Sequence, residues 1–114
     1  MHALFIVLNK TDYLDLILSK LIELGIDGAT IIDSQGMASA IVNESMEGIP
    51  MFGALKSLIG NDNPYSKTVF TVIKSHMLLS TAMEQIAELM MSVKNRPVGF
   101  MFTVPVEDVV RLGQ

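Results

Sequence analysis

Two short segments of the chain, residues 3–8 and 99–104, are almost entirely apolar. Their shortness and their β-branched and aromatic side chains favour strands over helices. Successive side chains of a strand point to opposite faces, so each of these strands would present apolar side chains on both sides. A sheet built from them needs cover on both faces, and this requirement constrains the fold more than any other feature of the sequence.

The composition is that of one folded domain. The chain has 114 residues, of which 50% are hydrophobic and 18% charged, whereas disordered chains are poor in apolar residues and rich in charge. It has no cysteine, which excludes a disulfide scaffold, a thiolate metal site and a cysteine nucleophile. A net charge of −4 and eight scattered basic residues argue against a nucleic-acid partner.

Nothing in the sequence predicts membrane insertion. A membrane helix needs about 20 consecutive apolar residues, and no run approaches that length. The apolar run at residues 3–8 has no basic leader before it and no small-residue cleavage site after it. We therefore expect a cytoplasmic protein.

The first third of the chain has a strand–helix–strand pattern. After the strand at residues 3–8, we expect a helix that is capped by Thr11 or Asp12 and ends at Gly25. Its apolar positions recur at the spacing of one helix face. They are Leu14, Ile17, Leu18, Leu21 and Ile22. Residues 29–34 are then expected to form the second strand.

The same pattern recurs late in the chain. Residues 67–73 are rich in β-branched side chains and predict a strand, and Ser75 is the expected cap of a second helix. The apolar stripe of that helix comprises Leu78, Leu79, Ala82, Met83, Ile86, Leu89 and Met90. Pro97 cannot continue a helix, so the second helix ends before it. Residues 99–104 are then expected to form the last strand, and residues 106–112 a short helical turn.

Two such units in tandem predict an α+β fold, the ferredoxin-like split β-α-β sandwich (βαββαβ). It has a four-stranded antiparallel sheet with two helices on one face, and residues 1–114 form this single domain. The units are joined by a long inserted segment, residues 37–66, in which residues 50–59 are expected to form a short helix. Connections this long in compact domains are often functional.

The apolar second face of the sheet predicts self-association. Helices cover one face, and the other would expose more than the few hundred Å² of contiguous apolar surface that monomers tolerate. We therefore expect a homo-oligomer with the sheets buried at its centre. The alternative is that residues 37–66 fold back over the open face.

Two stretches resemble the PII family of signalling proteins. Residues 28–37, Gly-Ala-Thr-Ile-Ile-Asp-Ser-Gln-Gly-Met, resemble that family's second strand, which closes on a glycine before a long loop. Residues 99–109 look like its last strand followed by an acidic turn. The resemblance spans most of the chain, residues 37–66 excepted.

The resemblance implies a non-enzymatic regulator involved in nitrogen regulation. PII-like proteins are homotrimers of ferredoxin-like protomers that bind adenine nucleotides between subunits and signal through a mobile loop to a protein target. The effector-binding residues implied here are Gly36, Met37, Lys94, Asn95 and Arg96. The sequence does not identify the target. The residues implied for docking to it are Glu44, Met46, Glu47, Met51 and Phe52.

The chain departs from the family in the loop before the last strand. That loop is glycine-rich in the family. Here the loop, residues 92–99, is shorter, lacks repeated glycines and includes Pro97, which has no N–H donor. Lys94 and Arg96 remain as ligands for a phosphate or a carboxylate. We therefore expect a small anionic effector, with ATP, ADP and AMP as candidates and no resident cofactor.

No motif in the sequence predicts catalysis or a metal site. His2 and His76 are the two histidines of the chain, and neither belongs to a recognisable ligand motif. No Ser-His-Asp arrangement, phosphate loop or paired-carboxylate spacing is present. The alternative to a regulator is a CutA-like metal-responsive trimer, or a small ferredoxin-fold enzyme with its cleft under residues 37–66.

Overall fold

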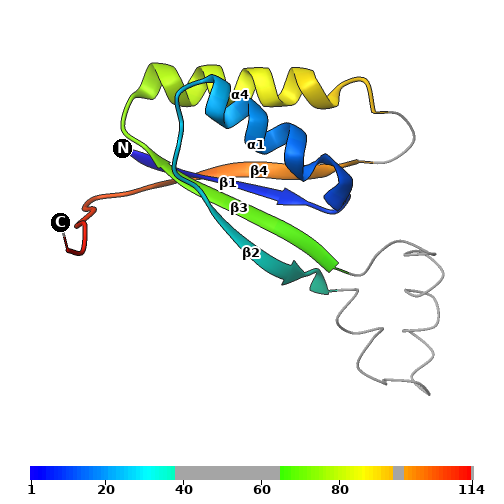
Figure 1. Ribbon diagram of the computed structural model, residues 1–114, viewed down its shortest axis with the longest axis horizontal. Coiled ribbons are helices and arrows are strands. Elements are labelled where there is room, and N and C mark those ends of the chain that lie inside the picture. Colours follow the sequence, from blue (N-terminus) through cyan, green and yellow to red (C-terminus); the bar gives the residue numbers. More distant parts are fainter. Residues whose placement is uncertain (38–64, 94–96, 114) are drawn as a thin grey trace.

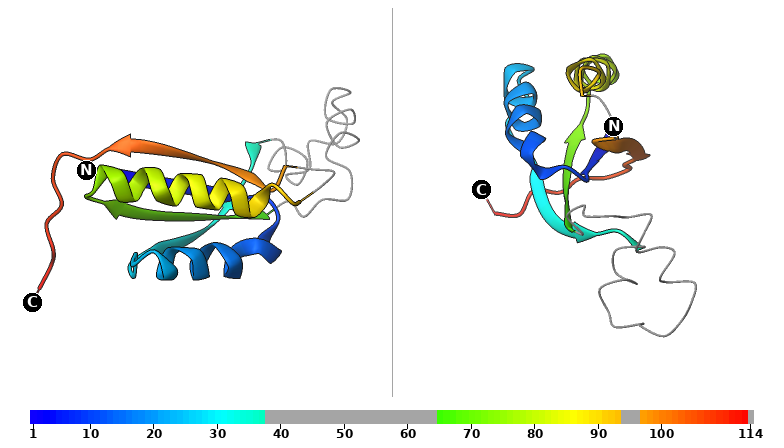
Figure 2. Two further views of the ribbon diagram at one scale, coloured as in Figure 1. Left: turned by 90° about the horizontal axis from the view of Figure 1, so that it is seen from above. Right: turned by 90° about the vertical axis from the view of Figure 1, so that its right-hand side faces the viewer.

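The computed structural model describes residues 1–37, 65–93 and 97–113. Four strands form one antiparallel sheet in the order β2-β3-β1-β4: β1 (His2–Leu8), β2 (Thr30–Gln35), β3 (Tyr65–Ile73) and β4 (Gly99–Pro105). Both helices, α1 (Leu14–Glu23) and α4 (His76–Met90), lie side by side on one face of this sheet (Figures 1 and 2). The α+β sandwich expected from the sequence is confirmed.

The register of β1 fixes which side chains share a face. Leu4 lies opposite Thr71 of β3 and Thr103 of β4, while Phe5 lies opposite Phe70 and Phe102. Alternation then places Leu4, Ile6 and Leu8 under the helices and Phe5 on the other face. The predicted two-faced character of the strands is thus present in the fold.

The core lies between the sheet and the helices. Its largest fully buried side chains are Leu4, Ile17, Leu21 and Val69, which come from β1, α1 and β3. Leu79, Ala82 and Ile86 of α4 complete it from above. At about 1.5–3 kcal/mol for each fully buried aliphatic side chain, this cluster supplies most of the driving force that holds the two layers together.

The ends of the helices follow local sequence signals. Gly25, with φ at +86°, ends α1: its N–H donates to the Ile22 carbonyl at 2.9 Å, and the Ile26 N–H donates to the Leu21 carbonyl at 2.8 Å. This pair of bonds is the Schellman arrangement that glycine permits. At the start of α4, the Ser75 hydroxyl accepts a hydrogen bond from the Leu78 N–H at 3.1 Å, so the predicted cap is confirmed.

Four local expectations are wrong. Neither Thr11 nor Asp12 caps α1 through its side chain, because a 3-10 turn, η1 (Thr11–Tyr13), leads directly into that helix. Ile22, at the margin of the predicted stripe, is 68% exposed. Residues 106–113 contain no regular structure. Finally, β3 begins at Tyr65, so the segment expected at residues 37–66 ends sooner than predicted.

Candidate functional site

A ladder of stacked phenylalanine rings crosses the face of the sheet opposite the helices, which we call the open face. Phe5 of β1 stacks on Phe70 of β3 at 5.5 Å between ring centroids and on Phe102 of β4 at 5.0 Å. Phe100 stacks on Phe102 at 6.1 Å. These separations are those of favourable aromatic pairs. The ladder arises because the strand register places Phe5 opposite two other phenylalanines.

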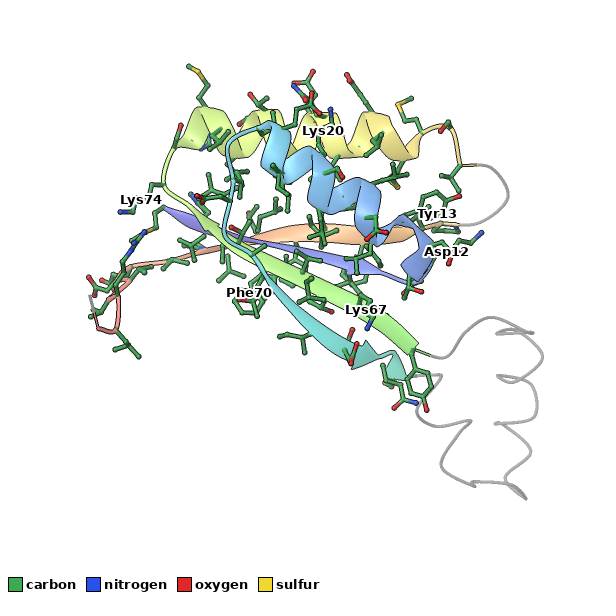
Figure 3. The ribbon with its side chains drawn as sticks, viewed as in Figure 1. Asp12, Tyr13, Lys20, Lys67, Phe70 and Lys74 are labelled. Atoms are coloured by element: carbon green, nitrogen blue, oxygen red, sulfur yellow. The ribbon has the colours of Figure 1, made fainter. Side chains whose placement is uncertain are left out.

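The ladder remains accessible within one chain. Phe100 is 59% exposed and Phe102 is 42% exposed, although both belong to a strand of the sheet, β4. Val72 on β3 and Val104 on β4 are also exposed on this face. Figure 3 shows Phe70 on the side of the sheet away from the helices. The chain by itself therefore leaves a contiguous apolar surface open to water.

The described residues of the predicted effector site, and those that flank its remaining candidates, fall at one end of the sheet but at its two opposite edges. Gly36 and Met37 follow β2, an edge strand, and both are exposed. Val93 and Pro97 flank the other candidates beside β4, the opposite edge strand. Three strand spacings of about 4.8 Å separate these edges by about 14 Å. Among the described residues of one chain, Gly36 and Met37 therefore lie apart from Val93 and Pro97.

The remaining predicted site residues lie outside the described part of the chain. Among the effector candidates these are Lys94, Asn95 and Arg96. All of the predicted docking residues are in the same position: Glu44, Met46, Glu47, Met51 and Phe52. The expected short helix at residues 50–59 also falls there.

The start of β4 is held firmly beside the end of β1. The backbone N–H groups of Asn9 and Lys10 both donate to the Val98 carbonyl, at 2.7 and 3.3 Å. At the next residue, a Cβ built on Gly99 would collide with the Val7 carbonyl, so no other residue type fits this close approach. These contacts fix the point at which the chain enters β4 from the predicted effector loop.

A group of hydroxyls fixes the opposite edge of the sheet, and no motif in the sequence predicts it. The Ser34 hydroxyl is hydrogen-bonded to Ser66 at 2.7 Å and to Thr68 at 2.8 Å. On the other side of the same strand pair, Lys67 forms an ion pair with Asp33. These contacts hold the end of β2, from which Gly36 follows. They depend on the β2–β3 register, which no local pattern discloses.

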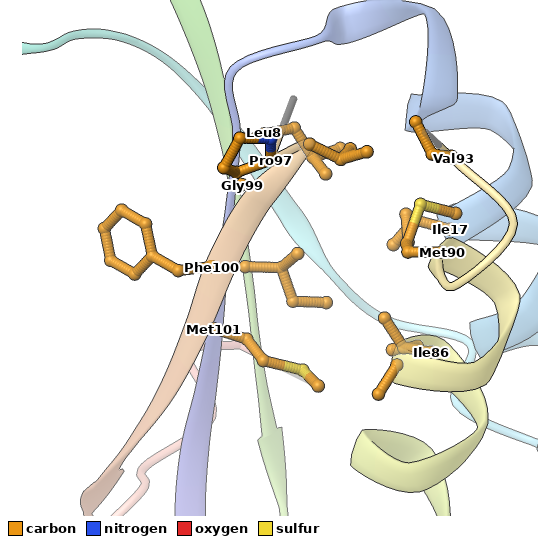
Figure 4. A pocket seen from close by; sticks show the side chains of 12 residues that line it. Leu8, Ile17, Ile86, Met90, Val93, Pro97, Gly99, Phe100 and Met101 are labelled. Atoms are coloured by element: carbon orange, nitrogen blue, oxygen red, sulfur yellow. The ribbon is translucent and has the colours of Figure 1, made fainter. Parts of the chain in front are cut away.

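A cavity of about 300 Å³ lies between the C-terminal half of α4 and the start of β4 (Figure 4). The described residues that line it are all apolar, and they include Leu8, Ile17, Ile86, Met90 and Met101. The Phe100 ring points away from this cavity toward the open face. None of the described residues that line this cavity carries a charge to balance that of an anion.

Within the described residues, no helix has the length and apolar character needed to cross a bilayer.

The search of curated protein sequences found no match to this chain. Among solved structures, the fold is similar to that of PII from Arabidopsis thaliana, which was crystallised bound to citrate. The two sequences are 20% identical, the match covers 96% of this chain and 80% of the plant chain, and the TM-score is 0.65. This likeness supports the fold. The family model for nitrogen regulatory protein P-II matches residues 1–114, so the chain belongs to the nitrogen regulatory protein P-II family.

Proposed function

We propose that this chain is a regulatory protein, not an enzyme, which assembles as a homotrimer and binds a small anionic effector between neighbouring copies. The observation that carries the proposal is the arrangement of the sheet. An exposed aromatic ladder on its open face calls for a partner of matching chemistry, and the chain leaves β2 through Gly36 and enters β4 from Pro97 at opposite edges of the sheet.

Self-association explains both features at once. A second copy offers the same apolar face, so burying one against the other removes Phe100 and Phe102 from water. A rotationally symmetric ring can also place the β2 edge of one copy beside the β4 edge of the next. The effector cleft would then combine Gly36 and Met37 of one copy with the residues that precede β4 in its neighbour.

The chemistry of the effector follows from the residues available. Lys94 and Arg96 offer the charge-assisted hydrogen bonds that phosphate and carboxylate oxygens accept. The citrate bound to the plant protein is a small polycarboxylate and is compatible with this class. ATP, ADP and AMP are the nucleotide candidates that family membership suggests. The predicted docking residues in the segment between β2 and β3 would carry the signal to a protein target.

Two measurements on the purified protein test the proposal. Sedimentation velocity should show a trimer, and a well-behaved monomer at micromolar concentration would refute the assembly. Calorimetry with ATP, ADP, AMP, cyclic nucleotides and citrate should give saturable heat with at least one of them. If a trimeric protein gave neither heat nor a thermal shift with any of these compounds, the effector part would be wrong.

A matched pair of variants locates the site. Lys94→Ala combined with Arg96→Ala should weaken binding by at least tenfold, because two charge-assisted contacts are lost. The control is Lys20→Ala, which removes a cation from α1, where its ammonium pairs with Glu23 at 3.1 Å. Equal affinities for the control and the double variant would show that the effector binds elsewhere.

A further inference from the structure

The two histidines of the chain, separated by most of its sequence, lie together in the fold. The ring centroids of His2 and His76 are 6.4 Å apart, with the ring planes inclined at 55°. His2 is half-buried and His76 is exposed. Within the described residues, neither ring has a hydrogen-bond or ion-pair partner. Both rings therefore have nitrogen lone pairs available to a ligand.

The topology of the sheet explains why they meet. His2 begins β1 and lies opposite Ile73, the last residue of β3. Its side chain points to the same face as Leu4, the face that the helices cover. Lys74 and Ser75 then carry the chain from β3 into α4, whose first residue is His76. A connection of two residues leaves the start of α4 directly above the start of β1. Figure 3 shows this end of the molecule, with Lys74 labelled beside it.

Paired imidazoles bind a restricted class of ligand. Neutral imidazole is a preferred ligand of Zn²⁺, Ni²⁺ and Cu²⁺, with a metal–nitrogen distance of about 2 Å. A shared ion at that distance places two ring centres roughly 5 to 6 Å apart. The observed separation of 6.4 Å is slightly larger than this range, and the His76 side chain is exposed. The spacing of the two rings is therefore close to that of a shared ion.

The surroundings set the strength of such a site. The described residues contain no cluster of three or more His, Cys, Asp or Glu side chains with metal-binding geometry, so the protein would supply two ligands and water the rest. The ion would also lie near the amino end of α4, whose partial positive charge opposes a cation. Both facts indicate moderate affinity and rapid exchange. They do not fit a structural metal required for folding.

We propose that His2 and His76 form a two-imidazole site for an exchangeable divalent transition-metal ion, at the end of the sheet where β1 begins. The site lies at the opposite end of β1 from Gly36 and Met37 and does not depend on the proposed effector.

The test uses the full chain without a polyhistidine tag. Because the protein has two histidines, their ring protons give two sets of NMR signals. Titration with Zn²⁺ should shift or broaden both sets together, and excess chelator should restore them. Calorimetry should show that His2→Ala and His76→Ala each weaken Zn²⁺ binding by at least tenfold. The double variant should lose little more than either single variant, because one ion needs both rings.

Controls separate this site from other modes of metal binding. Lys74→Ala changes a side chain in the same connection but removes no ligand, so it should retain the affinity. Thermal unfolding without metal should show that the histidine variants remain folded. The proposal is overturned if only one ring responds, or if Zn²⁺ or Cu²⁺ binds His76→Ala as tightly as the parent, since His2 and neighbouring backbone groups would then suffice. Metal-induced association of separate copies, detected by sedimentation, would overturn it as well.

Discussion

Replacing Phe100 with serine should dissociate the proposed trimer while leaving each protomer folded. Phe100 has the most exposed ring of the aromatic ladder, and among the described residues its one ring contact is with Phe102. Little of the protomer's own stability therefore depends on it. In a trimer assembled through the open face, the same ring would lie at the interface and be removed from water.

The size of the effect follows from the exposed area. A phenylalanine side chain presents about 200 Å², so the 59% that is exposed corresponds to about 120 Å². At about 25 cal/mol per Å², covering it contributes about 3 kcal/mol per copy, or about 9 kcal/mol per trimer. The trimer dissociation constant depends on the square of concentration, so this loss raises the midpoint concentration for assembly by roughly a thousandfold. Incomplete coverage of the ring would reduce this figure.

Sedimentation velocity over a wide concentration range measures that midpoint. The matched control is Ile22→Ser, which removes an apolar side chain that is 68% exposed, but on α1 rather than on the open face. The control should sediment like the parent protein, and Phe100→Ser should sediment as a monomer at micromolar concentration. If Phe100→Ser remained trimeric, or if both variants dissociated equally, the open face would not be the assembly surface.

Three further substitutions test the packing of the protomer, each by urea denaturation at one fixed protein concentration. Gly99→Ala forces a Cβ against the Val7 carbonyl and should cost about 1–3 kcal/mol; parental stability would show that β4 does not approach β1 so closely. Ser75→Ala removes the acceptor of the Leu78 N–H and should cost about 1 kcal/mol, whereas no loss would mean that the cap does not form in solution. Ile17→Ala empties a fully buried position and should cost about 2–5 kcal/mol; a cost below 1 kcal/mol would contradict its place in the core.

The sequence predicted the elements well because their signals are local. Residues 3–8 and 99–104 have the length and composition of strands, and the structure extends each by a single residue. Gly25 and Ser75 end and begin helices through bonds to near neighbours, so their chemistry could be recognised without tertiary information.

Expectations that depended on tertiary context succeeded less well. Ile22 fits the helical periodicity, but it lies at the margin of the stripe, where the rotation of α1 on the sheet decides burial. Residues 106–113 have apolar side chains at a spacing compatible with a helical turn, yet they form no regular structure. Propensity is a weak guide where no packing partner is present within the chain.

The candidate site could be predicted in part. The location of Gly36 and Met37 after β2 was expected, whereas their separation from the loop before β4 follows from strand order, which local patterns do not contain. The proximity of His2 to His76 was equally inaccessible, because it requires the β1–β3 register and a turn of the right length. The sequence shows which polar and charged side chains the chain contains, and the topology determines which of them meet.

The alignment of the strand ends has a practical consequence for building reporters from this protein. The Met1 carbonyl accepts a hydrogen bond from the Val106 N–H at 3.0 Å, so the first residue of the chain and the residue that follows β4 lie together at one end of β1. The seven residues of β1 span about 20 Å and separate that end from Gly36 and Met37. A fluorescent domain joined through residues 107–113 would therefore be attached at the end away from these two residues, whereas a fusion at Met1 would crowd the paired imidazoles. Carboxy-terminal fusions are thus the better starting point for a biosensor.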